Sequence, residues 1–202
     1  MVPVLQVLES RYGVVKAHIE TIHAYTNDLN LVDNMHTKAR RGRAGALNMV
    51  ITETGAGGAV SKILPKLKNK ITANAIRVPI PNGSLAILVV ELNKKTSISD
   101  VNQEFMALSL KPSKHKQIEI SFDEDFVSSD ILSNPVTGIL DASATSLSAD
   151  GYTLTLYVWY DNEYGYSTQV LGFASYLAKE HMGGTTANKY VNNSISLLGA
   201  NN

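Results

Sequence analysis

His23 is the side chain in this sequence best suited to acid–base chemistry, because it stands where an apolar run gives way to a polar one. The run Thr-Ile-His-Ala-Tyr-Thr-Asn-Asp covers residues 21–28, so a strand can hold the imidazole rigidly while it reaches a pocket. A general base at neutral pH needs this combination of fixed position and access. A histidine that only fills the core or the surface remains the alternative. The other histidines share no metal-ligand spacing and are expected to be structural: His18, His36, His115 and His181.

Two further segments could bind an anion. Residues 54–58, Thr-Gly-Ala-Gly-Gly, open an apolar helical stretch, and a helix start offers unpaired N–H groups and the positive end of the helix dipole. A tight turn without a ligand explains these glycines as well. Residues 38–43 carry four cations in six positions, which fits a phosphate cradle, a solvated face or a nucleic-acid patch. No aromatic side chains are interleaved with them and the net charge is zero, so nucleic acid is not expected as a partner.

The composition narrows the chemistry further. The chain has 202 residues, 44% of them hydrophobic, and 18 basic side chains balance 18 acidic ones. We expect one domain over residues 1–182, followed by a flexible tail over residues 183–202 that is rich in Gly, Thr, Asn and Ser. There is no cysteine, which excludes disulfides, thiolate metal sites and a cysteine nucleophile within this chain. No apolar run approaches the ~18 residues of a membrane span and no signal peptide is visible, so we expect a cytoplasmic protein without a membrane partner.

The hydrophobic pattern predicts the elements that must position these groups. Helices are expected near residues 3–12, 56–67, 99–110 and 167–181, and strands near residues 14–25, 48–52, 74–80, 84–92, 118–122, 138–147 and 152–160. Residues 26–47 show no period and should form a long loop. The turn Pro-Asn-Gly at 81–83 indicates that the strands on either side of it form an antiparallel pair. This order predicts an α+β domain with a mainly antiparallel, mixed sheet and helices packed on one face.

Three side-chain details complete the expected framework. One face of the first strand should carry Val15, Ala17, Ile19, Thr21 and His23. Ser99 should cap the third helix. The buried face of the last helix should consist of Val170, Leu171, Phe173, Ala174, Tyr176 and Leu177.

Taken in order, five segments resemble the glyceraldehyde-3-phosphate dehydrogenase family. They are Ile-His-Ala-Tyr-Thr at 22–26, Arg-Arg-Gly-Arg at 40–43, Thr-Glu-Thr-Gly-Ala at 52–56, Ile-Arg-Val-Pro at 76–79 and Trp-Tyr-Asp-Asn-Glu-Tyr-Gly-Tyr-Ser at 159–167. Together they resemble the C-terminal catalytic domain of the phosphorylating enzymes, from residue 3 to about residue 178. The chain departs from that pattern at Gly57 and Gly58, where alanine and lysine are usual, and at Gly83, where valine is common.

The resemblance implies a catalytic and a cofactor-binding role for three residues. His23 would be the base that activates a thiol and later handles the proton of the hemithioacetal. Asn162 would touch the nicotinamide carboxamide of NAD, and Tyr166 would lie nearby.

The resemblance also implies two phosphate sites. Thr26 and Arg77 would bind the C3 phosphate of glyceraldehyde 3-phosphate. Arg43, Thr54 and Gly55 would bind the attacking inorganic phosphate. These assignments agree with cations that can fork onto phosphate and with a helix start that can receive an anion.

Family members carry a nucleophilic cysteine just before the segment matched by residues 2–5, and an NAD-binding domain before that. Neither is found in this sequence, so we expect the chain to be inactive alone, although it resembles part of a glycolytic, homotetrameric NAD-dependent dehydrogenase. Two alternatives remain open: a non-catalytic interaction or assembly module, and one half of a split enzyme that a separate chain completes.

Overall fold

The computed structural model of the chain describes residues 1–111 and 116–182. Its helices are α1 (Val2–Arg11), α2 (Ala56–Ile63), α3 (Ile98–Ser109) and α4 (Tyr164–Met182), and its 3₁₀ turns are η1 (Ala39–Gly42) and η2 (Pro65–Leu67). Its strands are β1 (Val14–Ala24), β2 (Val50–Glu53), β3 (Ile71–Val78), β4 (Ser84–Leu92), β5 (Glu119–Ser121), β6 (Ile139–Asp141), β7 (Ser146–Leu147) and β8 (Thr153–Tyr160). The expected tail over residues 183–202 lies outside the described ranges.

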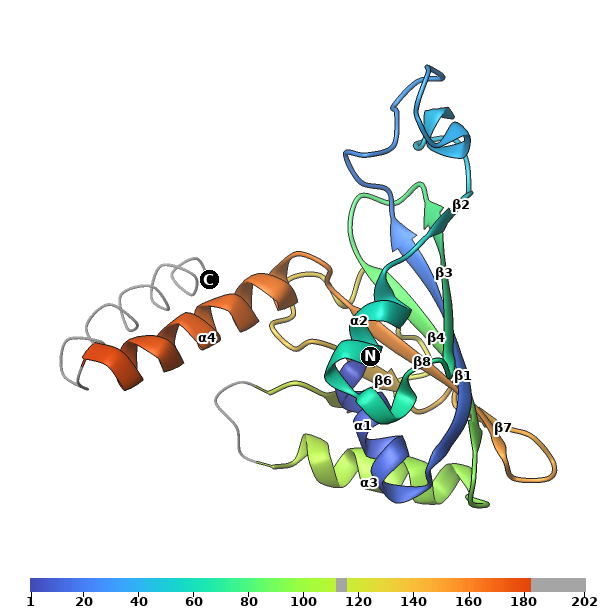
Figure 1. Cartoon of the computed structure of the whole chain (residues 1–202), viewed down its shortest axis with the longest axis vertical. Coiled ribbons are helices and arrows are strands. Elements are labelled where there is room, and N and C mark those ends of the chain that lie inside the picture. The colour runs from blue at the N-terminus through green and yellow to red at the C-terminus, as the bar shows by residue number, and fades with distance from the viewer. Residues whose placement is uncertain (112–115, 183–202) are drawn as a thin grey trace.

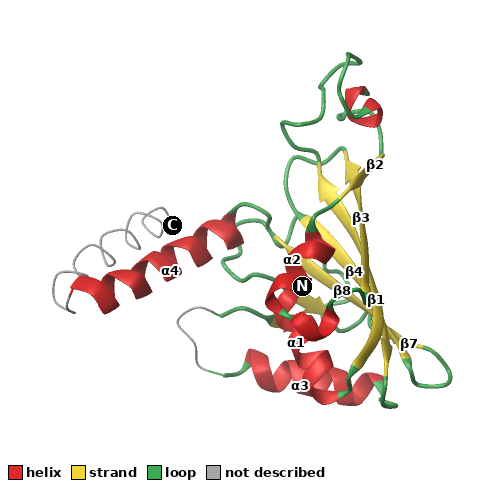
Figure 2. Cartoon of the chain, viewed as in Figure 1, coloured by secondary structure: helices red, strands yellow, loops and turns green. Residues whose placement is uncertain are grey.

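A single twisted sheet organises the domain. Its strand order is β2-β3-β1-β4-β8-β6-β5, with β7 added beside β8. The pairs β1/β3 and β5/β6 are parallel, and the remaining described pairs are antiparallel. Figures 1 and 2 show α1, α2 and α3 along one side of this sheet. The prediction of an α+β fold with a mainly antiparallel, mixed sheet is therefore confirmed.

The expected pairing of residues 74–80 with residues 84–92 is wrong, because β1 lies between β3 and β4. Ala75 of β3 and Ala86 of β4 both pair with Thr21 of β1. The link over residues 79–83 therefore crosses the end of β1 instead of forming a tight hairpin. It ends at Gly83, whose φ of +90° favours glycine. Turn residues indicate that the chain reverses direction, but they do not reveal which strand fills the space between.

The core lies between the sheet and three helices. The central strands contribute alternate residues, and the helices contribute one face each: Val4, Leu5, Leu8, Val60, Ala86, Leu88, Val90, Val101, Phe105, Leu154, Leu156 and Val158. Burial of each large apolar side chain contributes about 1.5–3 kcal/mol of transfer free energy. On β1 this buried face continues through Ala17, Ile19 and Thr21, and His23 follows it half-buried. The histidine therefore lies at the margin of the core, with a rigid strand behind it.

Two of the expected details differ in the structure. The register of β1 against β4 shifts between Val14 and Lys16, so Val14 is buried and Val15 is exposed. Such a bulge resets the alternation of a strand, which periodicity alone does not reveal.

The cap of α3 is Ser97 instead of Ser99: its hydroxyl oxygen accepts from the Asp100 N–H at 3.1 Å. The Asp100 carboxylate accepts in turn from the Ser97 hydroxyl at 2.7 Å.

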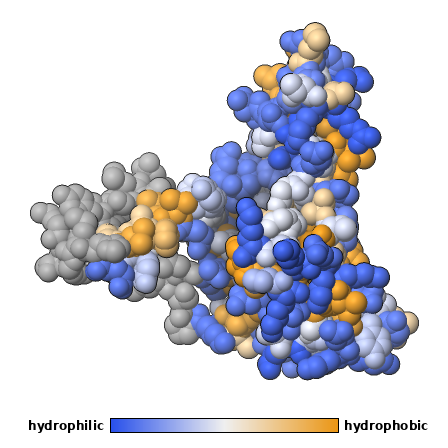
Figure 3. All heavy atoms as spheres, in the orientation of Figure 1, coloured by the Kyte–Doolittle hydropathy of each residue, from blue (hydrophilic) through white to orange (hydrophobic). Residues whose placement is uncertain are grey.

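The expectation of a buried face on the last helix is also wrong. α4 begins at Tyr164 and projects away from the sheet (Figure 1). The residues expected to be buried are exposed, Phe173 by 62%, and Figure 3 shows hydrophobic spheres gathered along this helix. An apolar stripe shows that a helix has a face to bury, but not that the same chain covers it. Within the described ranges, no helix combines the length and the hydropathy needed to cross a membrane.

Candidate active site

Four side chains form one row across the sheet. Arg77 of β3 pairs with His23 of β1, which in turn pairs with Ser84 of β4. Ser84 pairs with Tyr160 of β8. Residues that pair directly on neighbouring strands project from the same face, with Cβ atoms about 4.5–5.5 Å apart. Strand register therefore brings a cation, an imidazole, a hydroxyl and a phenol together at the margin of the core.

His23 and Arg77 are in direct contact. Nη1 of Arg77 lies 2.5 Å from Nδ1 of His23, and it also donates to the Ala24 carbonyl at 3.1 Å. The same Nδ1 lies 2.8 Å from the Ala24 carbonyl. Donation from Arg77 requires Nδ1 to be unprotonated, whereas a protonated Nδ1 would donate to Ala24 and leave Nε2 as the free base.

The surroundings of His23 favour the neutral imidazole. Burial lowers the pKa of His23 below 6.5, and the positive charge of Arg77 lowers it further. The hydrogen bond to the Ala24 carbonyl raises the pKa but does not outweigh these effects. A neutral histidine at a strand end can accept a proton at physiological pH. The predicted role of His23 as a base is chemically consistent with this environment.

Arg77 is a half-buried cation without an acidic partner. In the described part of the chain its guanidinium makes no ion pair, and its buried Nε atom has no hydrogen-bond partner. Burial lowers the pKa of this arginine below its usual value. A desolvated guanidinium that keeps a free donor is suited to bind an anion.

Tyr160 is a site residue that the sequence analysis missed. Its ring meets the His23 ring edge to face, with 6.1 Å between centroids and 71° between planes. Burial raises the pKa of Tyr160, and contacts with Ser84 and Arg77 only partly oppose that effect. The phenol is therefore a hydroxyl at neutral pH. Its presence in the motif over residues 159–167 was a signal, but only the strand register shows that it faces His23.

Asn162 is the second residue after β8 and lies next to two buried polar residues, Ser84 and Asp161. Its Oδ1 accepts from the Ser84 hydroxyl at 3.1 Å. The neighbouring Asp161 is buried, and its carboxylate accepts four hydrogen bonds, from Glu163 N and Tyr164 N at 2.8 Å each, Ser133 N at 2.9 Å and Asn82 Nδ2 at 3.2 Å. Asp161 thereby caps α4 and fixes the backbone on which Asn162 stands.

The predicted second anion site begins at α2. Gly55 is the N-cap of this helix, and the Thr54 hydroxyl accepts from the Ala56 N–H at 3.3 Å. Val50 of β2 pairs with Arg77, and Thr54 lies four residues further along, about 13 Å away at the usual rise of a strand.

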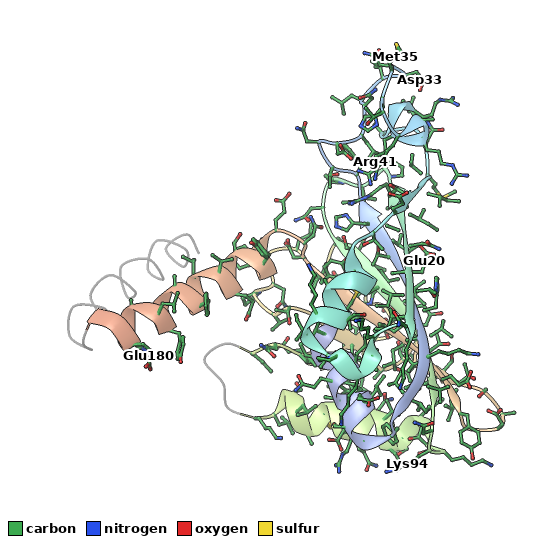
Figure 4. All side chains as sticks on the ribbon, in the orientation of Figure 1. Glu20, Asp33, Met35, Arg41, Lys94 and Glu180 are labelled. Atoms are coloured by element: carbon green, nitrogen blue, oxygen red, sulfur yellow. The ribbon has the colours of Figure 1, made fainter. Side chains whose placement is uncertain are left out.

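The arginines of residues 38–43 differ in their surroundings. The Arg43 side chain is 65% exposed and pairs with Asp33. The Arg41 side chain is only 15% exposed, pairs with Asp28 and donates from Nε to the Thr52 hydroxyl at 2.8 Å. Figure 4 shows Arg41 between the loop tip, marked by Asp33, and the strands. Arg41 is therefore the cation of this cluster that the fold brings toward Arg77, whereas the predicted role of Arg43 stays a prediction.

The remaining predicted residues lie at the edge of this arrangement. Thr26 is the second residue after β1 and is half-buried. Tyr166 lies on α4 with 72% of its surface exposed, so its predicted role near the cofactor also stays a prediction. Among the residues that the structure describes, no cluster of His, Cys, Asp or Glu could hold a metal ion.

Comparison with known proteins gives one family. The model of the glyceraldehyde 3-phosphate dehydrogenase C-terminal domain matches residues 1–162. A glyceraldehyde-3-phosphate dehydrogenase-like protein of Pseudomonas aeruginosa is 47% identical over 171 residues, which cover 85% of this chain and 37% of that protein. The glyceraldehyde-3-phosphate dehydrogenases of Mycobacterium bovis and Mycobacterium tuberculosis are 40% identical over 179 residues, which cover 89% of this chain and 52% of those proteins. The chain thus spans about half the length of its mycobacterial relatives, or less in the case of the Pseudomonas protein.

Proposed function

This chain belongs to the glyceraldehyde-3-phosphate dehydrogenase family, and we propose that it supplies the catalytic half of a phosphorylating enzyme. The complete enzyme would convert glyceraldehyde 3-phosphate, NAD and inorganic phosphate to 1,3-bisphosphoglycerate, in the cytoplasm and as a step of glycolysis. The observation that carries this proposal is that neutral His23 lies against the half-buried Arg77, which has no carboxylate partner among the described residues.

His23 would accept the proton of a thiol. The chain contains no cysteine, so the thiol would come from another part of the assembled enzyme, and the chain alone would be inactive. The unprotonated nitrogen needed for this step is Nε2 when Nδ1 carries the proton and donates to the Ala24 carbonyl. In that tautomer Arg77 lies beside the imidazole and donates to the Ala24 carbonyl, not to Nδ1. The Ala24 carbonyl would thus set the tautomer of the base.

Arg77 would bind the phosphate of the substrate, with Thr26 beside it. Among the described residues its guanidinium has no carboxylate partner, so its positive charge is available to a phosphate oxygen. Inorganic phosphate would bind near Thr54 and Gly55 at the start of α2, with Arg43 as the predicted cation. Arg41 is well placed to contribute to the same region, because it already bonds Thr52.

Among the described residues, Asn162 would meet the nicotinamide end of NAD. Asn162 uses its Oδ1 on Ser84, so its Nδ2 amino group remains to donate to a carboxamide oxygen. Bound NAD would supply the hydride acceptor, and Asn162 would orient the ring that faces the substrate.

Phosphate binding tests the proposal without needing catalysis. Titration of the ¹⁵N-labelled chain with inorganic phosphate should shift the amide signals of Thr26, Thr54 and Gly55 in the millimolar range, which corresponds to about 4 kcal/mol. Arg77→Ala should abolish the shift at Thr26. Arg11→Ala is the matched control, because Arg11 is exposed and pairs with Glu104 away from this face. Unchanged spectra, or equal shifts in wild type and Arg77→Ala, would remove the basis for the proposed phosphate site.

An assembly role is the second candidate, and the exposed apolar face of α4 favours it. In that case the chain would associate with family-like subunits, as expected for a homotetramer, or complete a split enzyme. Sedimentation of the chain, alone and mixed with a family NAD-binding domain, separates these cases. A chain that stays monomeric and does not bind that domain would count against an assembly role.

A further inference from the structure

Ser84 holds a central place among the site residues, but no role of its own has been assigned to it. It is the first residue of β4 and only 1% exposed, and its partners in the strand register are His23 on one side and Tyr160 on the other. A buried hydroxyl is costly without a hydrogen-bond partner. The Ser84 hydroxyl donates to Oδ1 of Asn162, at 3.1 Å.

The small size of Ser84 also matters. Strands β1 and β8 flank β4, so their backbones are about 9.6 Å apart. The rings of His23 and Tyr160 nevertheless approach to 6.1 Å between centroids. They do so across the β4 position that Ser84 occupies, so a larger side chain there would compete with the rings for the same space.

Hydrogen bonds of the neighbouring residues hold the segment that carries Asn162. On one side its backbone continues from β8, and on the other Asp161 clamps the start of α4 with bonds to Glu163 N and Tyr164 N. The Ser84 hydroxyl bonds the amide oxygen itself. An amide held through its oxygen presents its two N–H donors to the outside and selects an acceptor as ligand.

We propose that Ser84 is a positioning residue that fixes the Asn162 side-chain amide with its N–H donors facing the ligand. The proposed function enters only in naming the ligand group, the carboxamide oxygen of nicotinamide. The orientation is a property of this chain and exists before any cofactor binds.

The order of the Asn162 amide in the ¹⁵N-labelled full chain tests the proposal. Its NH₂ signals are assigned by their loss in Asn162→Asp, and relaxation gives their order parameter. We expect a value near ~0.85 in wild type and below ~0.6 in Ser84→Ala, the ranges of rigid and flexible groups. Ser84→Thr and Ser84→Val add the same bulk beside the His23 and Tyr160 rings, so a difference in amide order between them reports the hydroxyl alone. The threonine variant should be the more ordered of the two. This pair gives its own comparison, independent of Ser84→Ala.

Thr145→Val is the control for general destabilisation. It removes another buried hydroxyl, which bonds the Asp141 carbonyl at 2.9 Å, and should leave the Asn162 signal unchanged. Equal order in the threonine and valine variants of Ser84 would overturn the proposal, as would loss of order in Thr145→Val.

Failure of this proposal can be told apart from failure of the proposed function. The amide measurement needs neither phosphate nor NAD, and the phosphate titration does not involve Ser84. In an enzyme assembled with an NAD-binding half, Ser84→Val should raise KM for NAD several-fold over Ser84→Thr while KM for phosphate stays the same. An equal effect on both KM values would indicate general disruption and contradict the positioning role.

Discussion

The backbone N–H of Ser133 donates to Oδ2 of Asp161 at 2.9 Å, although Ser133 has a φ of +62° that residues with a Cβ rarely adopt. The bond joins two segments that are 28 residues apart in the sequence. Backbone strain of this kind persists where surrounding contacts compensate for it. Asp161 therefore ties the loop before β6 to the start of α4, next to Asn162.

Asp161→Ala should destabilise the domain by about 3 kcal/mol, because it removes a helix cap and leaves buried N–H groups without an acceptor. Urea unfolding measures the loss. Ser133→Gly keeps the N–H, relieves the strained φ and should not destabilise. A loss below ~0.5 kcal/mol in Asp161→Ala would show that the clamp is not structural.

Asp161 should also make stability depend on pH. Burial tends to raise the pKa of this carboxyl, but its hydrogen bonds from Tyr164, Glu163, Ser133 and Asn82 outweigh that effect and hold the pKa below 3.8. A depressed carboxyl pKa stabilises the fold above the unfolded value and loses that contribution as pH falls through the folded pKa. Acid unfolding of wild type and Asp161→Asn should therefore differ, with a weaker pH dependence in the variant below about pH 4.

Arg77→Leu should raise the pKa of His23, because it removes the positive charge that faces the imidazole. The other groups that face His23 are the neutral Tyr160 phenol and the Ala24 carbonyl, and Arg41 acts on Arg77 from the loop. NMR titration of the His23 ring measures the pKa, with Arg11→Ala as the control. A lower or unchanged pKa in Arg77→Leu would contradict the charge contact.

The lowered pKa of His23 also makes the stability of the fold depend on pH. Between the folded pKa and the unfolded value near 6.5 the unfolded chain binds more protons, so stability falls as pH drops through that window. Arg77→Leu raises the folded pKa of His23 toward the unfolded value, so it should narrow the pH window over which stability falls.

Gly57→Ala and Gly58→Ala should each stabilise the domain, because glycine is disfavoured against alanine in a helix; the gain should stay below the ~1 kcal/mol of a helix interior, since both residues lie in the first turn of α2. A Cβ at Gly58 meets nothing within 4 Å, and a Cβ at Gly57 makes ordinary contacts from 3.5 Å. Thermal unfolding measures both effects. Gly165→Ala is the opposite control, because its Cβ would lie 2.7 Å from the Val136 carbonyl oxygen and should destabilise.

The isolated chain should not reduce NAD with glyceraldehyde 3-phosphate and phosphate, because no side chain in it can supply a thiolate. Absorbance at the NADH wavelength is the measurement. The control is His23→Gln, which should give the same blank rate. A rate that depends on His23 in a contaminant-free preparation would refute the need for an external thiol.

The sequence by itself determined the family, most elements and the identity of the chemical groups. Local patterns carry this information: β1 and β4 are runs of β-branched and apolar residues, and the five motifs stand in order along the chain. Ser97 and Ser99 show the limit of such patterns, because both residues suit a cap and only the backbone geometry selects one.

Only the tertiary structure decided which of these groups meet. His23 and Tyr160 are far in sequence from each other and from Arg77 and Ser84, and all four become neighbours through the register of four strands, a non-local property. The insertion of β1 between β3 and β4 could not be deduced from the turn that links the latter two. Likewise, the apolar stripe of α4 was visible in the sequence, but its exposure depends on what packs against it, because burial is a relation between elements and not a property of one.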